Sequence, residues 1–451
     1  MQRRFQKANR KQMFLLPHSI DDWVSGEHLA RFIWDCVETF DLKPFYDSYA
    51  SEGAPPYDPQ MMLATLLYAW STGTRSSRQI AKACQEQIAC RWLTGNIIPD
   101  HCAFARFRSR HEQAINKLFN QVLLLCHEVG VLRLGKVFLD GTKIKGNAAL
   151  AASHTRKHIE KEIEKMLSEA KAADEEEDRK YGKDQRGEEL PEDLQDPTDR
   201  LARLKQAREI LAKKEAQERE AQQQLINKRE QEERETGKKK RGRKPADPES
   251  VVHQERKANV TDPDSRIMKS KEGYLQGFNS QAVVTEEQII IAAVVTQDEN
   301  DVHQLDPMLQ EVKDRLEETG IEQKPNALAA DAGYWREDLD VQAIEEQGTE
   351  LFIATANRFK EEQAAREQPP PEGRIPANAS KRDRMTHKLR TEAGKAIYKL
   401  RCQTVEPVFG QIKAAMGFRQ FLRRGLKAVQ SEWSLICLCF NLLKLHRAVV
   451  G

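Results

Sequence analysis

Two aspartates stand where a fold could bring their carboxylates together. Asp140 directly follows the apolar run Val137–Leu139, and Asp331 follows Ala327–Ala330 in the same way. Carboxylates at the carboxyl ends of strands project from the sheet edge at which open α/β folds place their sites. Each residue also fits a local role, because Asp-Gly is a turn signal and Asp331 could cap a following helix.

A third acid, Glu406, lies in a basic stretch with helical spacing. Glu406 and Lys413 are seven residues apart, so they share a face on a continuous helix. Pro407 either kinks this helix or marks its first turn, which leaves the place of Glu406 along the helix open. Taken alone, such a glutamate is most simply a surface ion-pair partner.

If the three acids lie together, their carboxylates can bind divalent metal ions. Hard oxygen ligands on one rim bind Mg²⁺ or Mn²⁺ and leave positions for water and phosphate oxygens. Two such ions, roughly 3.5 to 4 Å apart, can activate an attacking oxygen and stabilise the leaving one in phosphoryl transfer.

The charge of the 451-residue chain is nearly balanced overall but unevenly distributed. The whole chain has 72 Lys and Arg against 70 Asp and Glu, whereas 381–447 has 15 basic and four acidic residues. A surface that faces phosphates explains this excess, and a solvated helix surface is the alternative.

A highly charged segment interrupts the folded regions. Between Lys161 and Lys240, 43 of 80 residues are charged and Tyr181 is the single aromatic residue. This composition predicts a solvated helical insertion, for which a helical hairpin is one arrangement. The cationic run at its end could enter the minor groove of DNA or serve as a flexible tether. The cations singled out in this run are Lys239, Lys240, Arg241 and Arg243.

Several classes of protein are disfavoured. The longest uninterrupted apolar run, Ile289–Val295, is too short to cross a bilayer, and the first residues do not resemble a signal peptide. The eight cysteines are dispersed without a CxxC pair. We therefore expect a reduced cytoplasmic protein with no membrane span, zinc module or disulfide framework.

Hydrophobic spacing divides the chain into a helical first part and a mixed second part. Spacings of three and four predict helices over 27–40, 59–70, 76–85, 87–93 and 100–129. Strands are predicted over 136–139, 275–284, 288–295, 326–330 and 350–355, with helices over 302–318 and 336–347. This order predicts an α/β (mixed α+β) fold with a mixed sheet flanked by helices.

The helices on either side of Thr94–Asn96 could form a helix-turn-helix reader of DNA. Asp100 is a plausible N-cap of the second helix, and Arg106 and Arg108 follow it. An ordinary helical bundle is the alternative.

At these residues the sequence resembles the DDE transposases of bacterial insertion sequences. The resemblance depends on several motifs in the family's order, which cover both halves of the chain. The main ones are Phe138–Lys143, Gly273–Ala282, Ala329–Tyr334 and Thr404–Lys413, with weaker ones at 99–108 and 421–444.

The resemblance implies an RNase H-like catalytic domain with a five-stranded sheet. It also implies that Asp140, Asp331 and Glu406 form a metal-binding catalytic triad holding two Mg²⁺ or Mn²⁺ ions. A related signature would assign Tyr398, Arg401 and Lys413 to DNA phosphates, although the interval between Arg401 and Glu406 is one residue longer than in that signature. The position of the charged insertion also departs from many relatives.

The implied activity is binding of the terminal inverted repeats of an element, followed by cleavage and transfer into target DNA. Double-stranded DNA would be the partner, in the cytoplasm and nucleoid of a bacterium, with a homodimer at least during synapsis. A metal-dependent nuclease that cuts without joining, and an inactive DNA-binding regulator, are the alternatives.

Two further groups of acids are ambiguous. Asp262 and Asp264 could support the site, but a turn before a strand explains them better. Asp301 and His303 fit a helix start better than metal ligands.

The predicted organisation follows from these patterns. Residues 1–130 form a DNA-binding helical domain, 131–150 carry the first catalytic strand, 151–258 are the insertion, 259–355 complete the catalytic sheet, 356–395 are a mobile loop, and 396–451 are basic helices carrying the catalytic glutamate.

Overall fold

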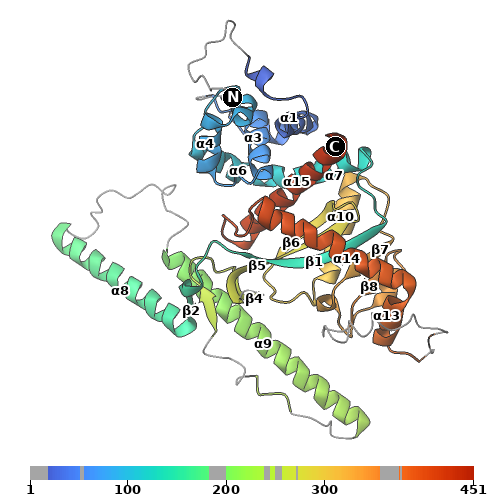
Figure 1. Ribbon diagram of the computed structural model, residues 1–451. Helices are drawn as coiled ribbons and strands as arrows, with labels where there is room; N and C mark the ends of the chain where they lie inside the picture. Colours follow the sequence, from blue (N-terminus) through green and yellow to red (C-terminus); the bar gives the residue numbers. More distant parts are fainter. Residues whose placement is uncertain are drawn as a thin grey trace, which may run out of the picture.

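A mixed sheet forms the centre of the molecule (Figure 1). The computed structural model describes residues 19–50, 55–181, 200–237, 244–248, 256–270, 273–355, 375 and 378–450. The sheet has the order β4-β5-β1-β7-β8, and β6 pairs with β5. Its strands are β1 (Lys136–Lys145), β4 (Arg266–Ser270), β5 (Gly273–Thr285), β6 (Ile290–Thr296), β7 (Ala327–Ala330) and β8 (Glu350–Ile353).

The strand directions confirm the mixed sheet. β1 is antiparallel to β5 and parallel to β7, which is in turn parallel to β8. The sheet has six strands instead of the predicted five, because β4 pairs with the first residues of β5. The short and largely polar sequence of β4 gave no apolar pattern to detect.

Helices cover both faces of the sheet. Side chains alternate along β1, so Val137 and Asp140 point to opposite faces. α10 (Leu305–Thr319) packs on the face of Val137, where Val137 and Leu328 lie beside it. α14 (Glu392–Gly410) packs on the other face and contacts β1 and β7. The expected helix over 336–347 is shorter, as α11 (Val341–Glu345).

The long helix α15 (Leu426–Val450) covers the free edge of β6. The side chain of Asn441 accepts a hydrogen bond from the Ile290 amide (2.9 Å) and donates one to the Ile290 carbonyl (2.8 Å). Gln430 likewise accepts from the Val295 amide (2.6 Å) and donates to the Ala293 carbonyl (2.9 Å). Side-chain amides thus replace a neighbouring strand.

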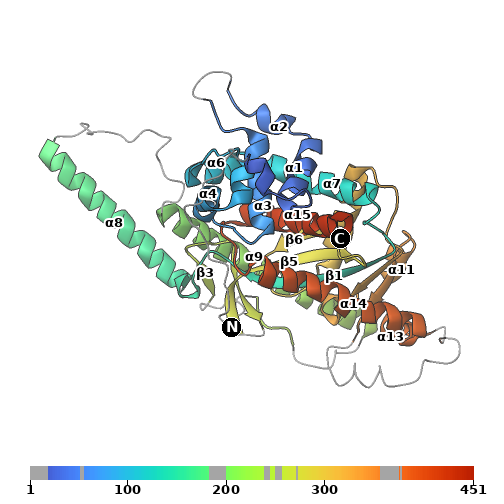
Figure 2. The ribbon, with the colours of Figure 1, turned by 45° about the horizontal axis from the view of Figure 1, so that its top comes forward.

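Helix α15 is also long and apolar enough to cross a membrane, although most of its apolar window is buried within the protein. It lies between the N-terminal helices and the sheet (Figure 2). Its composition is therefore accounted for by packing against α3, α7 and β6.

The N-terminal part is helical, as predicted. Its elements are η1 (Ile20–Trp23), α1 (Leu29–Thr39), α2 (Lys43–Tyr46), α3 (Pro59–Ser71), α4 (Ser77–Glu86), α5 (Ile88–Leu93), α6 (His101–Arg110) and α7 (Glu112–Glu128). The single helix predicted over 100–129 is wrong, because the chain breaks at His111 into α6 and α7. The Asp100 cap is confirmed by its hydrogen bond with the Ala103 amide (2.8 Å).

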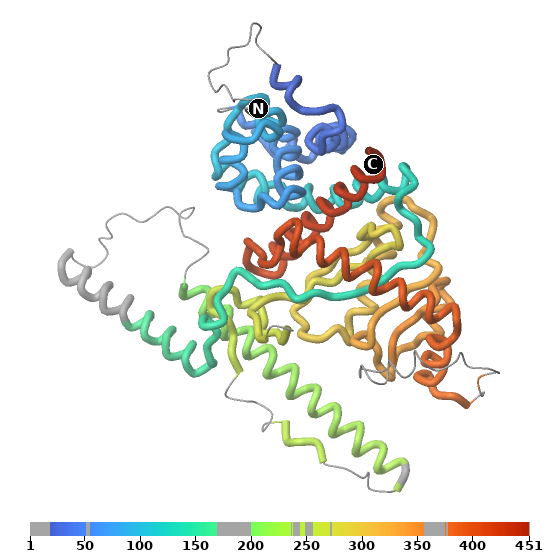
Figure 3. The backbone as a smooth tube through the Cα atoms, viewed as in Figure 1, coloured from blue at the N-terminus to red at the C-terminus, as the bar shows by residue number. Residues whose placement is uncertain are grey.

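The insertion is helical, as its composition indicated. α8 (Arg156–Tyr181) and α9 (Arg200–Thr236) pack together at their base through a small apolar cluster that includes Ile159 and Leu204. The pair β2 (Ser153–Thr155) and β3 (Lys257–Asn259), preceded by η2 (Leu150–Ala152), closes the insertion. Figure 3 shows α9 extending away from the sheet. The predicted cations at 239–243 lie outside the described residues.

The loop predicted over 356–395 is wrong for its last part. α13 (Lys381–Arg390) begins behind the N-cap Ser380 and is followed directly by α14. Met385 is its one buried residue, so the sequence carried too little apolar periodicity to indicate a helix.

We expect Asn441→Ala to destabilise the protein by about 2 to 6 kcal/mol. The substitution leaves a buried N–H and a buried C=O of Ile290 without partners, at about 1 to 3 kcal/mol each. Urea unfolding followed by circular dichroism measures the change. Lys427→Ala, on an exposed position of the same helix, is the control and should change stability by under about 0.5 kcal/mol. Equal effects of both substitutions would contradict the role of Asn441.

Candidate active site

The parallel pairing of β1 with β7 brings Asp140 and Asp331 together. Leu139 is paired with Ala330, which is the last pair of the ladder, and the two aspartates are the next residues on each strand. β1 itself continues to Lys145, because its other neighbour β5 continues to pair with it. Asp140 therefore marks the end of the parallel pairing and not, as predicted, the end of its strand.

Asp140 is held by an arginine and by its own neighbour. Its Oδ2 atom lies 3.1 Å from Nη1 of Arg401, and its Oδ1 accepts a hydrogen bond from the Gly141 amide (2.8 Å). Burial raises the pKa of Asp140 to about 6; Arg401 opposes this rise, whereas the charges of Asp331 and Asp301 add to it.

Asp331 begins the short helix η4 (Ala332–Tyr334) by capping it. Its Oδ1 accepts a hydrogen bond from the Gly333 amide (2.8 Å). Burial raises the pKa of Asp331, and Arg401 again opposes the rise. The N-cap role considered for Asp331 is thus confirmed. The hydrogen bond with Gly333 also orients the carboxylate, whose pKa the charge of Asp301 raises further.

Arg401 is the cation of this cluster. Its side chain is only 10% exposed, and its guanidinium lies over the Tyr398 ring, 5.7 Å from the centroid. Burial would lower the pKa of Arg401, but Asp140, Tyr398 and Asp331 together raise it. Its Nε atom is buried and has no hydrogen-bond partner among the described residues.

Asp301 belongs to the same neighbourhood, although the sequence favoured a helix start. α10 begins at Leu305 with Gln304 at the N-cap, so the helix-start interpretation of Asp301 is wrong. Its Oδ1 instead accepts hydrogen bonds from Asn279 (2.7 Å) and Gln281 (2.6 Å) of β5. The one available signal was the alternation of Asn279 and Gln281, which places both on one face of a strand.

Glu406 lies within α14 and not at its start, because Pro407 is accommodated inside the helix. A proline at 407 cannot donate to the Gln403 carbonyl four residues earlier, and Gln288 donates to that carbonyl instead (3.4 Å). The side chain of Glu406 is exposed. Among the described residues, no hydrogen bond or ion pair joins it to Asp140 or Asp331.

Lys413 brings the end of this helix back to β1. It lies in the π-helical turn η5 (Gln411–Ala415), and its Nζ donates to the Thr142 hydroxyl (2.5 Å) and to the Lys143 carbonyl (3.1 Å). Arg401 and Lys413 therefore contact β1 on either side of Glu406 along the chain.

The two predicted arginines of the N-terminal helices have different surroundings. Arg106 is exposed and lines a hollow with Tyr49, Tyr57 and Arg110. Arg108 instead points inward, with its guanidinium 5.4 Å from the centroid of the Trp70 ring. Burial lowers the pKa of Arg108, while Glu432 opposes this shift. Arg108 thus packs inside the protein, whereas Arg106 is exposed, with its Nε donating to the Cys102 carbonyl (3.4 Å).

The acids Asp262 and Asp264 lie in a turn before β4, as predicted, in which the Ser265 amide donates to the Asp262 carbonyl (3.1 Å), and their side chains also cap a helix. Asp262 accepts a hydrogen bond from the Gly425 amide (3.2 Å), and Asp264 from the Leu426 amide at the start of α15 (3.0 Å). In the described part of the chain, one group of three metal-ligating side chains has all its ligand atoms within 4.8 Å. It comprises the exposed residues Asp100, His101 and Cys102.

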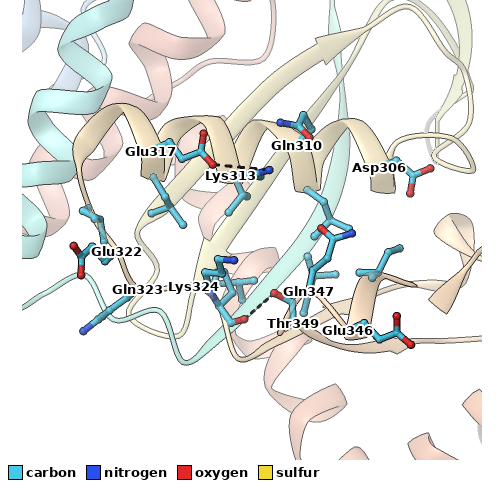
Figure 4. Close-up of a pocket in the computed structure, with 18 of the residues that line it drawn as sticks. Asp306, Gln310, Lys313, Glu317, Glu322, Gln323, Lys324, Glu346, Gln347 and Thr349 are labelled. Carbon is cyan, nitrogen blue, oxygen red and sulfur yellow. Dashed lines mark hydrogen bonds and ion pairs between the residues drawn. The ribbon is translucent and has the colours of Figure 1, made fainter. Parts of the chain in front are cut away.

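A separate groove of about 990 Å³ lies beside α10 (Figure 4). Lys313 and Glu317 on α10, and Lys324 and Glu346 opposite, provide charged groups around it. None of the three predicted catalytic acids lines this groove, so it is distinct from the acid cluster.

Two family models match the chain. One is described as a transposase domain (DUF772) and matches residues 18–110; the other is a transposase DDE domain and matches 371–446. Searches of curated proteins and of solved structures found no match. The second match includes Glu406 but neither aspartate.

The chain therefore carries transposase domains in its N-terminal and C-terminal parts, and its sheet is consistent with the RNase H-like fold of a DDE domain. The two matches support a relationship to the DDE transposases of insertion sequences.

Gly141→Ala should disturb the acid cluster. A Cβ at this position would lie 2.3 Å from Nε2 of Gln281 and 2.8 Å from Oδ1 of Asp301, so both side chains must move. We expect a loss of about 1 to 3 kcal/mol in unfolding free energy, measured by urea titration.

Gly135→Ala is the matched control, because its Cβ would meet a single atom of Glu286 at 3.7 Å, an ordinary contact. It should leave stability unchanged or slightly higher. If the two variants unfold alike, the space next to Gly141 is not as restricted as the structure indicates.

Proposed function

We propose that this transposase binds the ends of its insertion sequence and catalyses metal-dependent cleavage and strand transfer of DNA. The observation that supports this most directly is the partly buried pair Asp140 and Asp331, adjacent across two parallel strands, with Arg401 ion-paired to Asp140. Such a pair is costly to bury, and carboxylates with perturbed pKa values cluster at functional sites.

The residues present fit a divalent metal ion. Besides burial, the charge of Asp331 raises the pKa of Asp140, and the charge of Asp301 raises the pKa of both; a cation bound between Asp140 and Asp331 would relieve this repulsion. Carboxylate oxygens are the ligands that Mg²⁺ and Mn²⁺ prefer. We assign Asp140, Asp331 and Glu406 to two such ions, which when bound would activate the attacking oxygen and stabilise the leaving one.

The cations of α14 are suited to hold the DNA backbone. The buried Nε of Arg401 has no partner among the described residues, and a phosphate oxygen is a strong acceptor for such a group. Tyr398 lies beside the same guanidinium, and Lys413 contacts β1 two residues beyond Asp140. These three residues would orient a phosphate toward the two aspartates.

Other basic residues would bind the rest of the DNA. Arg106 is exposed on α6, and α13 adds the exposed Lys381, Arg382 and Arg384. The cationic run at 239–243 would contribute further phosphate contacts. Target and end must be held together, so we infer a homodimer during synapsis, in the bacterial cytoplasm where chromosomal DNA lies.

The test is incubation of the purified protein with a labelled duplex that carries the inverted repeat flanking its gene. With Mg²⁺ or Mn²⁺ we expect nicking and, with a second duplex present, joining of the freed 3′-hydroxyl. Asp140→Asn, Asp331→Asn and Glu406→Gln should each lower the cleavage rate at least about a thousandfold while retaining binding to the end.

The outcomes separate the alternatives. Cleavage without joining of a precut end would favour a nuclease. Binding without cleavage under either metal ion would favour a DNA-binding regulator. Normal cleavage by Glu406→Gln alone would keep the activity and exclude Glu406 from the site.

Metal binding should weaken as pH falls through the pKa of Asp140. Because that pKa is about 6, above the usual value of 3.8, the carboxylate is largely ionised at pH 7 and largely protonated at pH 5. A metal ion needs the ionised form, so the apparent Mn²⁺ affinity should fall about tenfold between these values. Titration calorimetry at each pH measures it.

The Arg401→Gln variant tests the cause of this dependence. Arg401 lowers the pKa of Asp140, so its removal should shift the pH dependence of Mn²⁺ binding to higher pH. A shift to lower pH, or none, would show that the ion pair does not control the ionisation of Asp140.

A further inference from the structure

Four residues from three of the recognised motifs surround the side chain of Asp301, which belongs to none of those motifs, and a fifth residue is linked to it through Gln281. Asn279 and Gln281 donate hydrogen bonds to Oδ1 of Asp301. A Cβ on Gly141 would lie 2.8 Å from Oδ1 of Asp301, and one on Gly333 would lie 3.5 Å from its Oδ2. The fifth residue, Tyr334, donates a hydrogen bond from its hydroxyl to the side-chain oxygen Oε1 of Gln281.

Asp301 reaches the site from behind the catalytic strand. Gly141 and Asp140 are neighbours on β1, so the Cβ direction of Gly141 is opposite to that of Asp140. Asp301 fills the space on that far side, where any side chain at 141 would collide with it. Its carboxylate therefore backs the peptide that follows Asp140.

The same carboxylate is connected to the second aspartate. Gln281 is fully buried and bridges Asp301 to the buried Tyr334. Tyr334 is the last residue of η4, the short helix that Asp331 caps. The backbone carbonyl of Gln281 also accepts a hydrogen bond from Trp433 (3.1 Å), which fixes it from α15. Asp301 is thus tied to β1 on one side and to the Asp331 turn on the other.

We propose that Asp301 is a positioning residue of the transposase active site, which fixes the spacing of Asp140 and Asp331 through Gly141, Gln281 and Tyr334. The inference rests on the proposed function, in which those two aspartates hold divalent metal ions. Asp301 acts as a hydrogen-bond acceptor for two amides, and its role requires an oxygen at the Oδ1 position.

The experiment compares Asp301→Ala with Asp301→Asn. The alanine variant removes the acceptor of both amides, so we expect Mn²⁺ affinity without DNA, measured by calorimetry, to fall about ten- to a hundredfold, with a similar fall in end cleavage. The asparagine variant keeps an oxygen acceptor and should restore both to within about threefold of the wild type.

Two controls make the result specific. Glu299→Gln removes one negative charge from an exposed position of the same loop and should leave both measurements unchanged. Gln281→Met keeps the length of the side chain but removes its bonds to Asp301 and Tyr334, so it should reproduce the loss of Asp301→Ala. This second variant tests the proposal even if Asp301→Ala fails to fold.

Wild-type affinity in Asp301→Ala or in Gln281→Met would overturn the proposal. So would an asparagine variant as defective as the alanine variant, because the carboxylate would then act as a ligand and not as a positioning group. If the wild-type protein itself binds no Mn²⁺ and cleaves no end, the proposed function fails regardless of Asp301.

Discussion

The parallel pairing of β1 with β7 determines where the two aspartates of the proposed active site lie. The pairing ends at Leu139 and Ala330, so the residues that follow place two carboxylates side by side. A slip of one residue would turn Asp331 to the opposite face of the sheet and separate it from Asp140. β7 consists of three alanines and a leucine, and its small side chains leave room for α14 to approach with Arg401. The position of the Arg401 guanidinium thus follows from the same short β1–β7 pairing.

Bringing two acids together in a partly buried place costs stability, and the structure shows how that cost is limited. Each carboxylate accepts a hydrogen bond from a nearby backbone amide, and Arg401 offsets part of their repulsion. The pKa values of both aspartates stay raised, chiefly because of burial and further because of neighbouring negative charges. Stability comes from elsewhere, since one continuous apolar core joins the N-terminal helices, the sheet and α15. A locally unfavourable arrangement supported by a well-packed surrounding is typical of functional sites.

The sequence predicted the parts of the fold that depend on periodicity. The N-terminal helices, the main strands and the helical insertion all have regular apolar or charge patterns, and the structure confirms them. It did not predict α13, whose buried face is a single methionine, or the break at His111, where apolar spacing continues across two helices. Asp140 and Asp331 could be predicted because both follow apolar strands. Asp301 could not, because it lies in the loop after β6, and only the course of that loop beyond the β5–β6 hairpin brings it back to Asn279 and Gln281.

The N-terminal helices and the sheet, to which we assign end binding and catalysis, are joined through Glu432 of α15. This buried carboxylate accepts hydrogen bonds from the amides of Leu422 and Arg423, and Arg423 pairs with Glu112 of α7 (2.8 Å). The same segment bridges back to the end of β1, where Gln420 pairs with Lys145. N-terminal helices, the turn that follows Lys413 and the strand that carries Asp140 therefore form one connected unit. A DNA end held by the N-terminal helices would accordingly be held at a fixed distance from the two aspartates, without a flexible linker between recognition and chemistry.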